Sequence, residues 1–357
     1  MKQIDCSDKG ACQLLLNEAS QRGNNFTGEQ FPTLNLPMIV KPLESQVGGL
    51  GKSKRRILTM PSSILGRESL TCDEQRHSVG FVLKPVREDH RGIREIAFYE
   101  QLLRLSALSK SRNDDDDEYN LEMSTSDMIL NMFYDFIPMY YGVVQICKNS
   151  IADRYILLED VTYPFQRPHV MDIKMGHQTW EPGESSFKID TETTKYPMQH
   201  VYGFRITGMR IFTWDSLSQS WVIQTLDKQY GRSLQTRDEL SRAFKVFFTT
   251  QHDSPMNHVN MEAIHTVLTQ LYQVRQCFES NSDFGFFASS ILIVVEGCSA
   301  DCSNDTERMG PLAKVKMIDF GHVQRRMERD VGYLHGIATL CDILENIIRK
   351  SQETDNI

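Results

Sequence analysis

Residues 168–176 read PHVMDIKMG, an apolar run that contains one acidic and one basic side chain and ends in glycine. Short apolar runs of this kind predict a buried β-strand, here over residues 169–175. Because side chains alternate between the two faces of a strand, Asp172 and Lys174 are expected on the same face. Such a pair is either a plain ion pair or part of a site that binds a nucleotide.

A second segment contains a lysine and a glutamate suited to phosphate binding. Lys84 lies in the predicted strand SVGFVLKPV (78–86), downstream of a glycine-rich turn at 48–51. Glu95 lies on the next predicted helix, 90–108, for which Asp89 is a suitable N-cap. A strand lysine can reach ATP phosphates while a helix glutamate holds it in place. Taken alone, Lys84 fits a surface lysine on an edge strand better than a phosphate ligand.

A third segment, MIDFGH at 317–322, places Asp319 at the end of an apolar strand. A carboxylate in that position can bind Mg²⁺ between phosphate oxygens. An Asp-Phe-Gly triplet also occurs by chance, so the segment has weight only together with the other two. The three segments together indicate a nucleotide site.

The order of the predicted elements divides the chain into two lobes. Strands are expected at 139–147, 155–161, 203–212, 286–297 and 313–320, and helices at 237–250, 260–279 and 333–349. This order predicts an α+β protein with a small, mostly β N-lobe and a larger α+β C-lobe.

Composition sets the predicted boundaries. Residues 1–36 lack periodicity and are predicted to be a mobile leader. The acidic stretch 109–127 is predicted to be a disordered insertion that could contact protein partners. The N-lobe is expected over 37–159, the C-lobe over 160–350 and a tail over 351–357.

Charge and hydropathy exclude several classes of protein. Lys and Arg number 39 against 47 Asp and Glu, a net charge of −8 that argues against direct nucleic-acid binding. The longest apolar stretch, 286–295, is too short to span a bilayer, and the N-terminal residues lack a secretory signal. Eight scattered cysteines predict reduced thiols. We therefore expect a soluble, intracellular protein.

The Pro-x-x-x-Asp-x-Lys-x-Gly pattern at 168–176 resembles the signature of the inositol polyphosphate kinase family. SSIL (289–292) and MIDF (317–320) are similar to its downstream motifs, and further similar stretches cover most of residues 40–350. Within the family, the multikinases are the most similar branch. The resemblance implies a two-lobed kinase fold with ATP between the lobes. It also implies transfer of the ATP γ-phosphoryl group to hydroxyls of inositol 1,4,5-trisphosphate and tetrakisphosphates, and possible activity on phosphoinositide.

Other members of the family are less similar. The trisphosphate 3-kinases carry a long helical insertion after the signature, whereas only residues 177–202 separate Gly176 from Gly203 here. The hexakisphosphate kinases, which make pyrophosphates, are nearer in layout and stay an alternative. A scaffold role in transcriptional or signalling complexes is a further alternative, although intact Lys84, Asp172, Lys174 and Asp319 argue against a protein without catalytic activity.

The resemblance also implies roles for individual residues, with ATP and Mg²⁺ as cofactors. It implies that Lys174, Asp172 and Asp319 are catalytic, and that Asp319 is the metal ligand. The ATP-binding residues would be Lys84, Glu159, Asp160, Val161, Asp172 and Asp319, and the substrate-binding residues Arg91, Lys174, Lys188, Lys195, Lys228 and His322.

Two departures from the multikinase pattern concern the acceptor pocket. Thr191 and Glu192 stand where multikinases have two glutamines, and Lys228 stands where mammalian-type multikinases have glutamine. A carboxylate beside phosphates is unfavourable, so Glu192 is expected to turn away or to contact a free hydroxyl. The basic run 52–56 is either a nuclear signal or a loop near phosphates, and the expected location is nucleus and cytoplasm.

Overall fold

The computed structural model describes residues 3–5, 33–35, 41–42, 57–60, 80–111, 123–148, 151–250, 258–297, 313–326 and 328–355. Contacts divide the chain into two compact units. The first unit comprises Met1–Gln46 and Leu50–Tyr163, and the second comprises Val47–Gly49 and Pro164–Ile357. Each unit is described by itself below. No helix in the described part of the chain combines the length and apolarity needed to cross a membrane.

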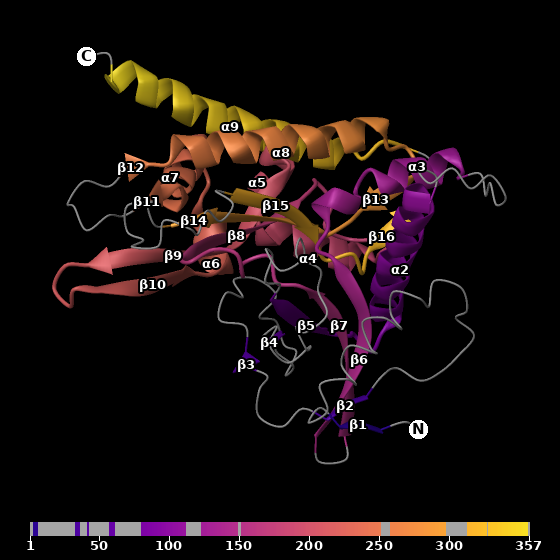
Figure 1. The fold of residues 1–357 in the computed structure, drawn as a ribbon. Helices are drawn as coiled ribbons and strands as arrows, with labels where there is room; N and C mark the ends of the chain where they lie inside the picture. Colours follow the sequence, from indigo (N-terminus) through magenta and orange to yellow (C-terminus); the bar gives the residue numbers. More distant parts are fainter. Residues whose placement is uncertain are drawn as a thin grey trace. The chain divides into compact units, whose positions relative to one another are not determined.

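A mostly antiparallel sheet forms the framework of the first unit (Figure 1). Its strands follow the order β1-β2-β6-β7-β5-β4-β3, and the long strands β6 (Tyr140–Lys148) and β7 (Ile151–Glu159) form a hairpin at its centre. Strand β5 (Phe81–Pro85) pairs with the other edge of β7. The short outer strands are β1 (Gln3–Asp5), β2 (Thr33–Asn35), β3 (Lys41–Pro42) and β4 (Leu58–Met60).

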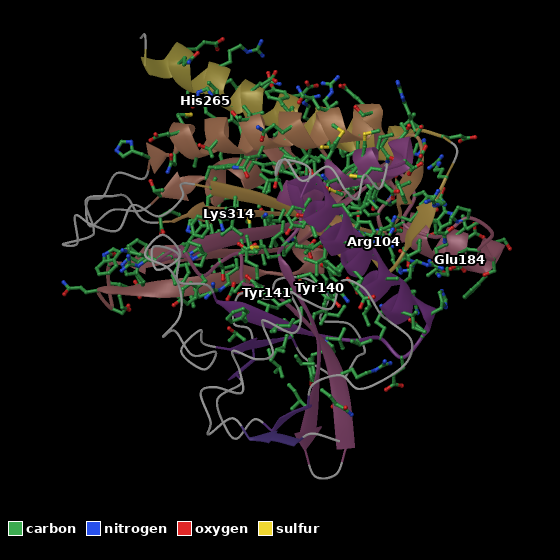
Figure 2. All side chains as sticks on the ribbon, turned by 45° about the vertical axis from the view of Figure 1, so that its right-hand side comes forward. Arg104, Tyr140, Tyr141, Glu184, His265 and Lys314 are labelled. Carbon is green, nitrogen blue, oxygen red and sulfur yellow. The ribbon has the colours of Figure 1, made fainter. Side chains whose placement is uncertain are left out.

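The long helix α2 (His90–Ser111) packs against this sheet through an apolar stripe. Leu102 and Leu105 are buried on it, and the ring of Tyr99 stacks on Tyr140 of β6 with centroids 5.2 Å apart. Figure 2 labels Tyr140 and its neighbour Tyr141 on that strand. Asp89 caps the helix as predicted, because its Oδ1 accepts the backbone N–H of Arg91 at 3.1 Å. Helix α3 (Thr125–Asn131) and the 3₁₀ turn η4 (Tyr134–Phe136) follow.

An antiparallel five-stranded sheet is the centre of the second unit. Its order is β10-β9-β8-β14-β15, which places β8 in the middle with a partner on each side. Strand β8 is paired along both edges and its own Met171 and Ile173 side chains are fully buried, so its polar residues are held in fixed positions. The strands are β8 (Pro168–Met175), β9 (Phe204–Asp215), β10 (Ser220–Leu226), β14 (Ser290–Glu296) and β15 (Ala313–Ile318).

Helices cover one face of this sheet, where α8 and α9 lie side by side (Figure 1). Helix α8 (Met261–Ser280) also contacts β15, and α9 (Val331–Asp355) contacts α7 and the end of β8. Phe278 of α8 stacks on Tyr333 of α9 with centroids 4.0 Å apart. The remaining elements are α4 (Ser186–Lys195), α5 (Met198–Tyr202), α6 (Lys228–Ser233), α7 (Arg237–Phe247), β11 (Thr249–Thr250), β12 (His258–Val259), β13 (Phe284–Phe286) and β16 (Val323–Arg325).

The α+β fold class is confirmed, with three corrections to the predicted elements. The helix predicted over 237–250 ends at Phe247, because Thr249–Thr250 form β11. A single strand over 286–297 is wrong at its start, because β13 pairs with β16 and a turn with Ala288 at φ 54° precedes β14. The predicted insertion 109–127 is too wide: Ser111 still belongs to α2, and Ser124 caps α3 by accepting the N–H of Asp127. Its centre, 112–122, lies outside the described residues.

Three other predictions fall wholly or mainly outside the described residues. Within the predicted leader, 1–36, the structure describes only β1 and β2. The glycine-rich turn at 48–51 and the basic run at 52–56 are not among the described residues. The predicted lobe boundary after Glu159 lies four residues before the point at which the two units divide, Tyr163.

Candidate active site

Strand β8 holds the acid and the base of the signature on one face. Asp172 lies opposite Leu292 of β14, and Lys174 lies opposite Ser290 of the same strand. On the other edge of β8, Lys174 is paired with Arg205 of β9. A central strand with partners on both sides fixes these two side chains more firmly than a loop would.

Asp319 reaches the same place through the register of three strands. Lys174 pairs with Ser290, Ser290 pairs with Ile318 of β15, and Asp319 follows directly. Its backbone is left-handed, with φ 67°, a conformation that is uncommon for residues other than glycine and is enriched at functional sites. The sheet thus brings Asp172, Lys174 and Asp319 together although 145 positions separate the last two.

Electrostatics show that the three groups interact. Burial and the neighbouring charge of Asp319 raise the pKa of Asp172, against the opposing effects of the Thr207 and Ser290 side chains and of the Lys174 charge. Burial lowers the pKa of Lys174, while Asp319 and Asp172 favour its charged form. The Lys174 Nζ donates to the carbonyl of Ala288 at 3.1 Å, and Oδ1 of Asp172 is buried with no hydrogen-bond partner in the described part of the chain. A buried oxygen of this kind is available to a ligand.

A β-bulge beside Asp172 was not predicted. The pairing of β8 with β9 shifts between Asp172 and Ile173, so that Thr207 is the extra residue on β9. The Thr207 hydroxyl donates to the backbone carbonyl of Asp172 at 3.1 Å, which satisfies a group that the bulge could leave unpaired. Bulges often re-aim a side chain next to an active site.

In the first unit, Lys84 and Glu95 form the contact that the sequence suggested. The Lys84 Nζ lies 2.6 Å from Glu95 Oε1, which joins β5 to the first turns of α2. The Glu95 side chain is 4% exposed and that of Lys84 is 19% exposed. A nearly buried carboxylate therefore orients an ammonium group that solvent can still reach.

The predicted hinge follows β7, and two of its backbone N–H groups are already engaged. The N–H of Glu159 donates to Met139 at 2.8 Å and that of Asp160 donates to Gly80 at 2.8 Å. The Asp160 carboxylate accepts two hydrogen bonds from Thr162. Of the three predicted residues, Val161 alone has a backbone N–H without a backbone partner among the described residues. If this segment binds adenine as predicted, the Val161 N–H is the backbone donor that remains available.

Four of the predicted substrate-binding residues have acidic partners within their own unit. The guanidinium of Arg91 is hydrogen-bonded to Asp89, which lowers the pKa of that carboxyl to about 2. The other three pairs are Lys188 with Glu184, Lys195 with Glu192, and His322 with Glu181, whose Oε1 lies 2.6 Å from the imidazole. Glu184 is labelled in Figure 2. Lys228 is exposed at the start of α6, which Asp227 caps.

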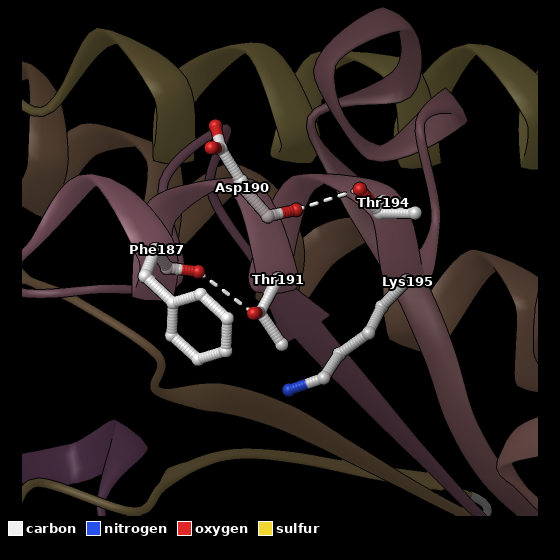
Figure 3. Close-up of a pocket in the computed structure, with 5 residues that line it drawn as sticks. All are labelled: Phe187, Asp190, Thr191, Thr194 and Lys195. Carbon is white, nitrogen blue, oxygen red and sulfur yellow. Dashed lines mark hydrogen bonds between the residues drawn. The ribbon is translucent and has the colours of Figure 1, made fainter.

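Helix α4 carries two of these lysines and a shallow depression along one side (Figure 3). Phe187, Thr191 and Lys195 line it at four-residue spacing, with Asp190 and Thr194 beside them. The hydroxyls of Thr191 and Thr194 donate back to the helix carbonyls of Phe187 and Asp190, both at 2.7 Å. Because Phe187 is 80% exposed, the depression is partly apolar.

Sequence reasoning missed Arg205, which lies beside Lys174. It pairs with Lys174 across the sheet, is 8% exposed, and its Nη2 lies 3.7 Å from Glu192 Oε2. An arginine inside an apolar predicted strand was the available signal, since buried arginine is rare without a partner. Its partner could not be identified because the contact depends on the register of β9 and on the position of α4.

Comparison with known proteins places the chain in a family. The family model described as inositol polyphosphate kinase matches residues 155–345, more than half of the chain. The chain belongs to the inositol polyphosphate kinase family. The inositol polyphosphate multikinases of Mus musculus and Rattus norvegicus are each 30% identical to this family member, over 76% and 80% of its length. The inositol hexakisphosphate kinase 2 of Homo sapiens is 25% identical over 58%.

The relatives differ from this family member in length. The matched part of this chain covers 58% of the length of the mouse multikinase and 61% of that of the rat protein. Among solved structures, the inositol phosphate multikinase Ipk2 from S. cerevisiae, in complex with ADP and Mn²⁺, has a TM-score of 0.52 and 21% identity. The match covers 75% of this chain and 99% of the yeast chain, and it confirms the two-lobed fold of the family.

Proposed function

We propose that this member of the inositol polyphosphate kinase family transfers the γ-phosphoryl group of ATP to free hydroxyls of inositol polyphosphates, as a multikinase. The observation that carries the proposal is the convergence of Asp172, Lys174 and Asp319 from two distant segments of the sheet. An ammonium flanked by two carboxylates suits phosphoryl transfer, which depends on positioning and on charge stabilisation. The greater similarity to multikinases than to hexakisphosphate kinases supports the choice of branch.

The carboxylates of this site fit a divalent cation such as Mg²⁺. Asp319 and Asp172 disfavour each other's charge, and Oδ1 of Asp172 is buried without a partner among the described residues. Asp319 would hold the ion, with the free oxygen of Asp172 available to the ion or to the nucleotide. The described residues contain no group of three acidic, histidine or cysteine ligands, and Mg²⁺ commonly binds one or two carboxylates together with substrate phosphates. When bound, the ion would neutralise charge on the phosphate oxygens.

The nucleotide would also use residues of the first unit. Lys84, held by Glu95, presents an ammonium for the ATP phosphates. The Val161 N–H is a donor for the adenine edge. Lys174 would neutralise the γ-phosphoryl group as it is transferred, because its ammonium is held by the Ala288 carbonyl next to the two carboxylates.

The acceptor would bind to a set of cations that now have acidic partners. Lys188 and Lys195 on α4, His322 after β15, and Arg91 in the first unit each contact a carboxylate, and exposed Lys228 lies on α6. Acceptor phosphates could share these cations with their carboxylates, since solvent still reaches the side chains and ion pairs in contact with solvent are weak. Lysine imposes less geometry than arginine, so several acceptor isomers could be accepted.

Three further parts of the proposal rest on the family and on composition. Phosphoinositide would be a second acceptor, the acidic stretch at 112–122 would contact protein partners, and the protein would occupy nucleus and cytoplasm. A microscopy experiment with a fluorescent fusion tests the location, and a pull-down with and without residues 112–122 tests the partner surface.

The test of the reaction is an ATP-consumption assay over a panel of acceptors, with products resolved by chromatography. Inositol 1,4,5-trisphosphate and tetrakisphosphates should be phosphorylated at more than one ring position. If hexakisphosphate is the best acceptor, the protein is a hexakisphosphate kinase. If no acceptor stimulates ATP consumption, the scaffold alternative replaces the enzyme.

A further inference from the structure

A largely buried ion pair lies beside Lys174, and the Arg205 member has no role in the account given above. Glu192 on α4 and Arg205 on β9 approach to 3.7 Å, and their side chains are 17% and 9% exposed. Arg205 is the cross-strand partner of Lys174, so the pair adjoins the proposed transfer site. The pair is therefore close enough to influence which acceptor the site binds.

Glu192 has all its partners inside the protein. One carboxylate oxygen accepts from Lys195, and the other accepts from the Thr179 hydroxyl at 3.3 Å and faces Arg205. The positive charges of Lys195, Arg205 and Lys174 lower the pKa of Glu192 in spite of its partial burial, so the group is ionised at neutral pH. One carboxylate thus offsets the charge of several cations.

Arg205 has more than one cationic neighbour. Helix α6 packs tightly on β9, since Gly231 lies against the carbonyl of Ile206, and this brings the charge of Arg232 near Arg205. If the Glu192 carboxylate were absent, the charges of Lys195, Arg205 and Arg232 would no longer be offset on the α4 side of Lys174, and the region would become more positive. Such a region would favour the acceptor with the most phosphates.

We propose that the Glu192–Arg205 pair sets the number of phosphates that the acceptor site prefers. The Glu192 carboxylate partly neutralises the positive charges of Arg205 and Lys195. The site therefore favours acceptors with few phosphates over fully phosphorylated ones. Arg205 supplies the charge that Glu192 balances and is a specificity-determining residue next to Lys174. This inference rests on the proposed function and adds to it a choice among inositol phosphates.

The test is a double-mutant cycle read out as a preference between two acceptors. Dissociation constants for inositol trisphosphate and hexakisphosphate are measured calorimetrically without ATP, for the wild type, Glu192→Gln, Arg205→Gln and the double variant. Glu192→Gln should shift the preference toward hexakisphosphate by about tenfold, because one opposing charge is lost near several phosphates. Arg205→Gln should shift it about tenfold toward trisphosphate.

The double variant decides between charge balance and simple packing. Since it removes one positive and one negative charge, its preference should return to within about threefold of the wild type. If the pair only stabilises the fold, each single variant should have a lower melting temperature and should bind both acceptors more weakly by the same factor. The preference between the two acceptors would then be unchanged. That result would overturn the inference.

A matched control and an activity measurement separate the remaining outcomes. Glu279→Gln, which removes a carboxylate paired with Arg275 on the exposed side of α8, should leave the preference unchanged. If the wild type neither binds nor phosphorylates any inositol phosphate, the proposed function fails and this inference fails with it. If the wild type is active but the preference does not move in the single variants, the inference alone is wrong.

Discussion

Lys174 is the residue on which the proposed chemistry depends most, because two carboxylates and a carbonyl surround its ammonium. Replacing it with methionine keeps the length of the side chain and removes the charge. We expect turnover to fall by about 10²–10³-fold, the usual loss for one contact to charge that develops during transfer. Steady-state kinetics measures this, with a melting curve to show that the variant is folded. Near wild-type turnover in a folded Lys174→Met protein would remove the catalytic role from Lys174.

Glu95 should act on ATP through Lys84. Since the two groups lie 2.6 Å apart and Glu95 is nearly buried, Glu95→Gln should loosen the Lys84 ammonium and raise the KM for ATP several-fold, with little change in the KM for the acceptor. Glu100→Gln on the same helix is the control, because its hydrogen-bond partner is Tyr140. Equal effects of both variants on ATP and acceptor would indicate a purely structural role for Glu95.

At this scale the sequence predicted the chemical groups but only part of their contacts. Asp172 and Lys174 share a face because strand periodicity is local, and Asp319 could be assigned by its position after an apolar strand. Arg205 and the bulge at Thr207 could not be predicted, since both depend on the register between β8 and β9. Register is set by packing over the whole sheet.

Among the elements, α7 shows a helix end that local sequence fixes. Thr236 and Glu239 form a capping box, in which each side chain accepts the other's backbone N–H. Thr236→Ala should lower the free energy of unfolding by about 1 kcal/mol and leave kcat unchanged. Urea unfolding measures the loss. Thr269→Ala, in the middle of α8, is the control and should cost nothing, because alanine is the better helix former. No loss with Thr236→Ala would mean that α7 is held by packing alone.

The end of β8 meets α5 and α9 at three histidines. The ring of His177 lies 4.8 Å from that of His200 and 4.9 Å from that of His335. Burial and the charges of His335 and His200 lower the pKa of His177, with Asp330 opposing them. A lowered pKa means that the unfolded chain binds more protons below about pH 6.5, so the stability contributed by neutral His177 is lost as pH falls below that value.

His177→Gln tests this expectation. The free energy of unfolding should depend less on pH between 7.5 and 5.5 in the variant than in the wild type, as measured by urea unfolding at both values. His258, exposed on β12, provides the control, and His258→Gln should keep the wild-type dependence. An unchanged slope in His177→Gln would show that the three rings do not interact electrostatically.

Elements with a strong apolar pattern could be predicted from the sequence, and elements without such a pattern could not. The apolar stripe of α8 and the run of β14 are visible in the sequence. Helix α4, SFKIDTETTK, has a weak stripe and many threonines, and its start depends on the Ser185 cap. Strand β10 is mostly exposed and lies at the edge of the sheet, so it lacks the apolar signal of a core strand.

For the whole molecule, the central claim is that residues from distant segments form one phosphoryl-transfer site. Asp319 comes from the C-terminal part of the chain and Lys174 from the signature, and the sequence alone predicts both as site residues. Their proximity requires the order β8-β14-β15, which the sequence order of the strands does not reveal. The Asp319 backbone conformation is also a product of the folded chain.

The most direct measurement follows the label from γ-³²P-ATP into inositol 1,4,5-trisphosphate, with Mg²⁺ present, for the wild type and for Asp319→Asn. The account predicts labelled inositol tetrakisphosphate with the wild type, and about 10²–10³-fold slower labelling with a variant whose melting curve matches the wild type. No label in any inositol phosphate with the wild type, or equal labelling by the folded Asp319→Asn protein, would contradict it.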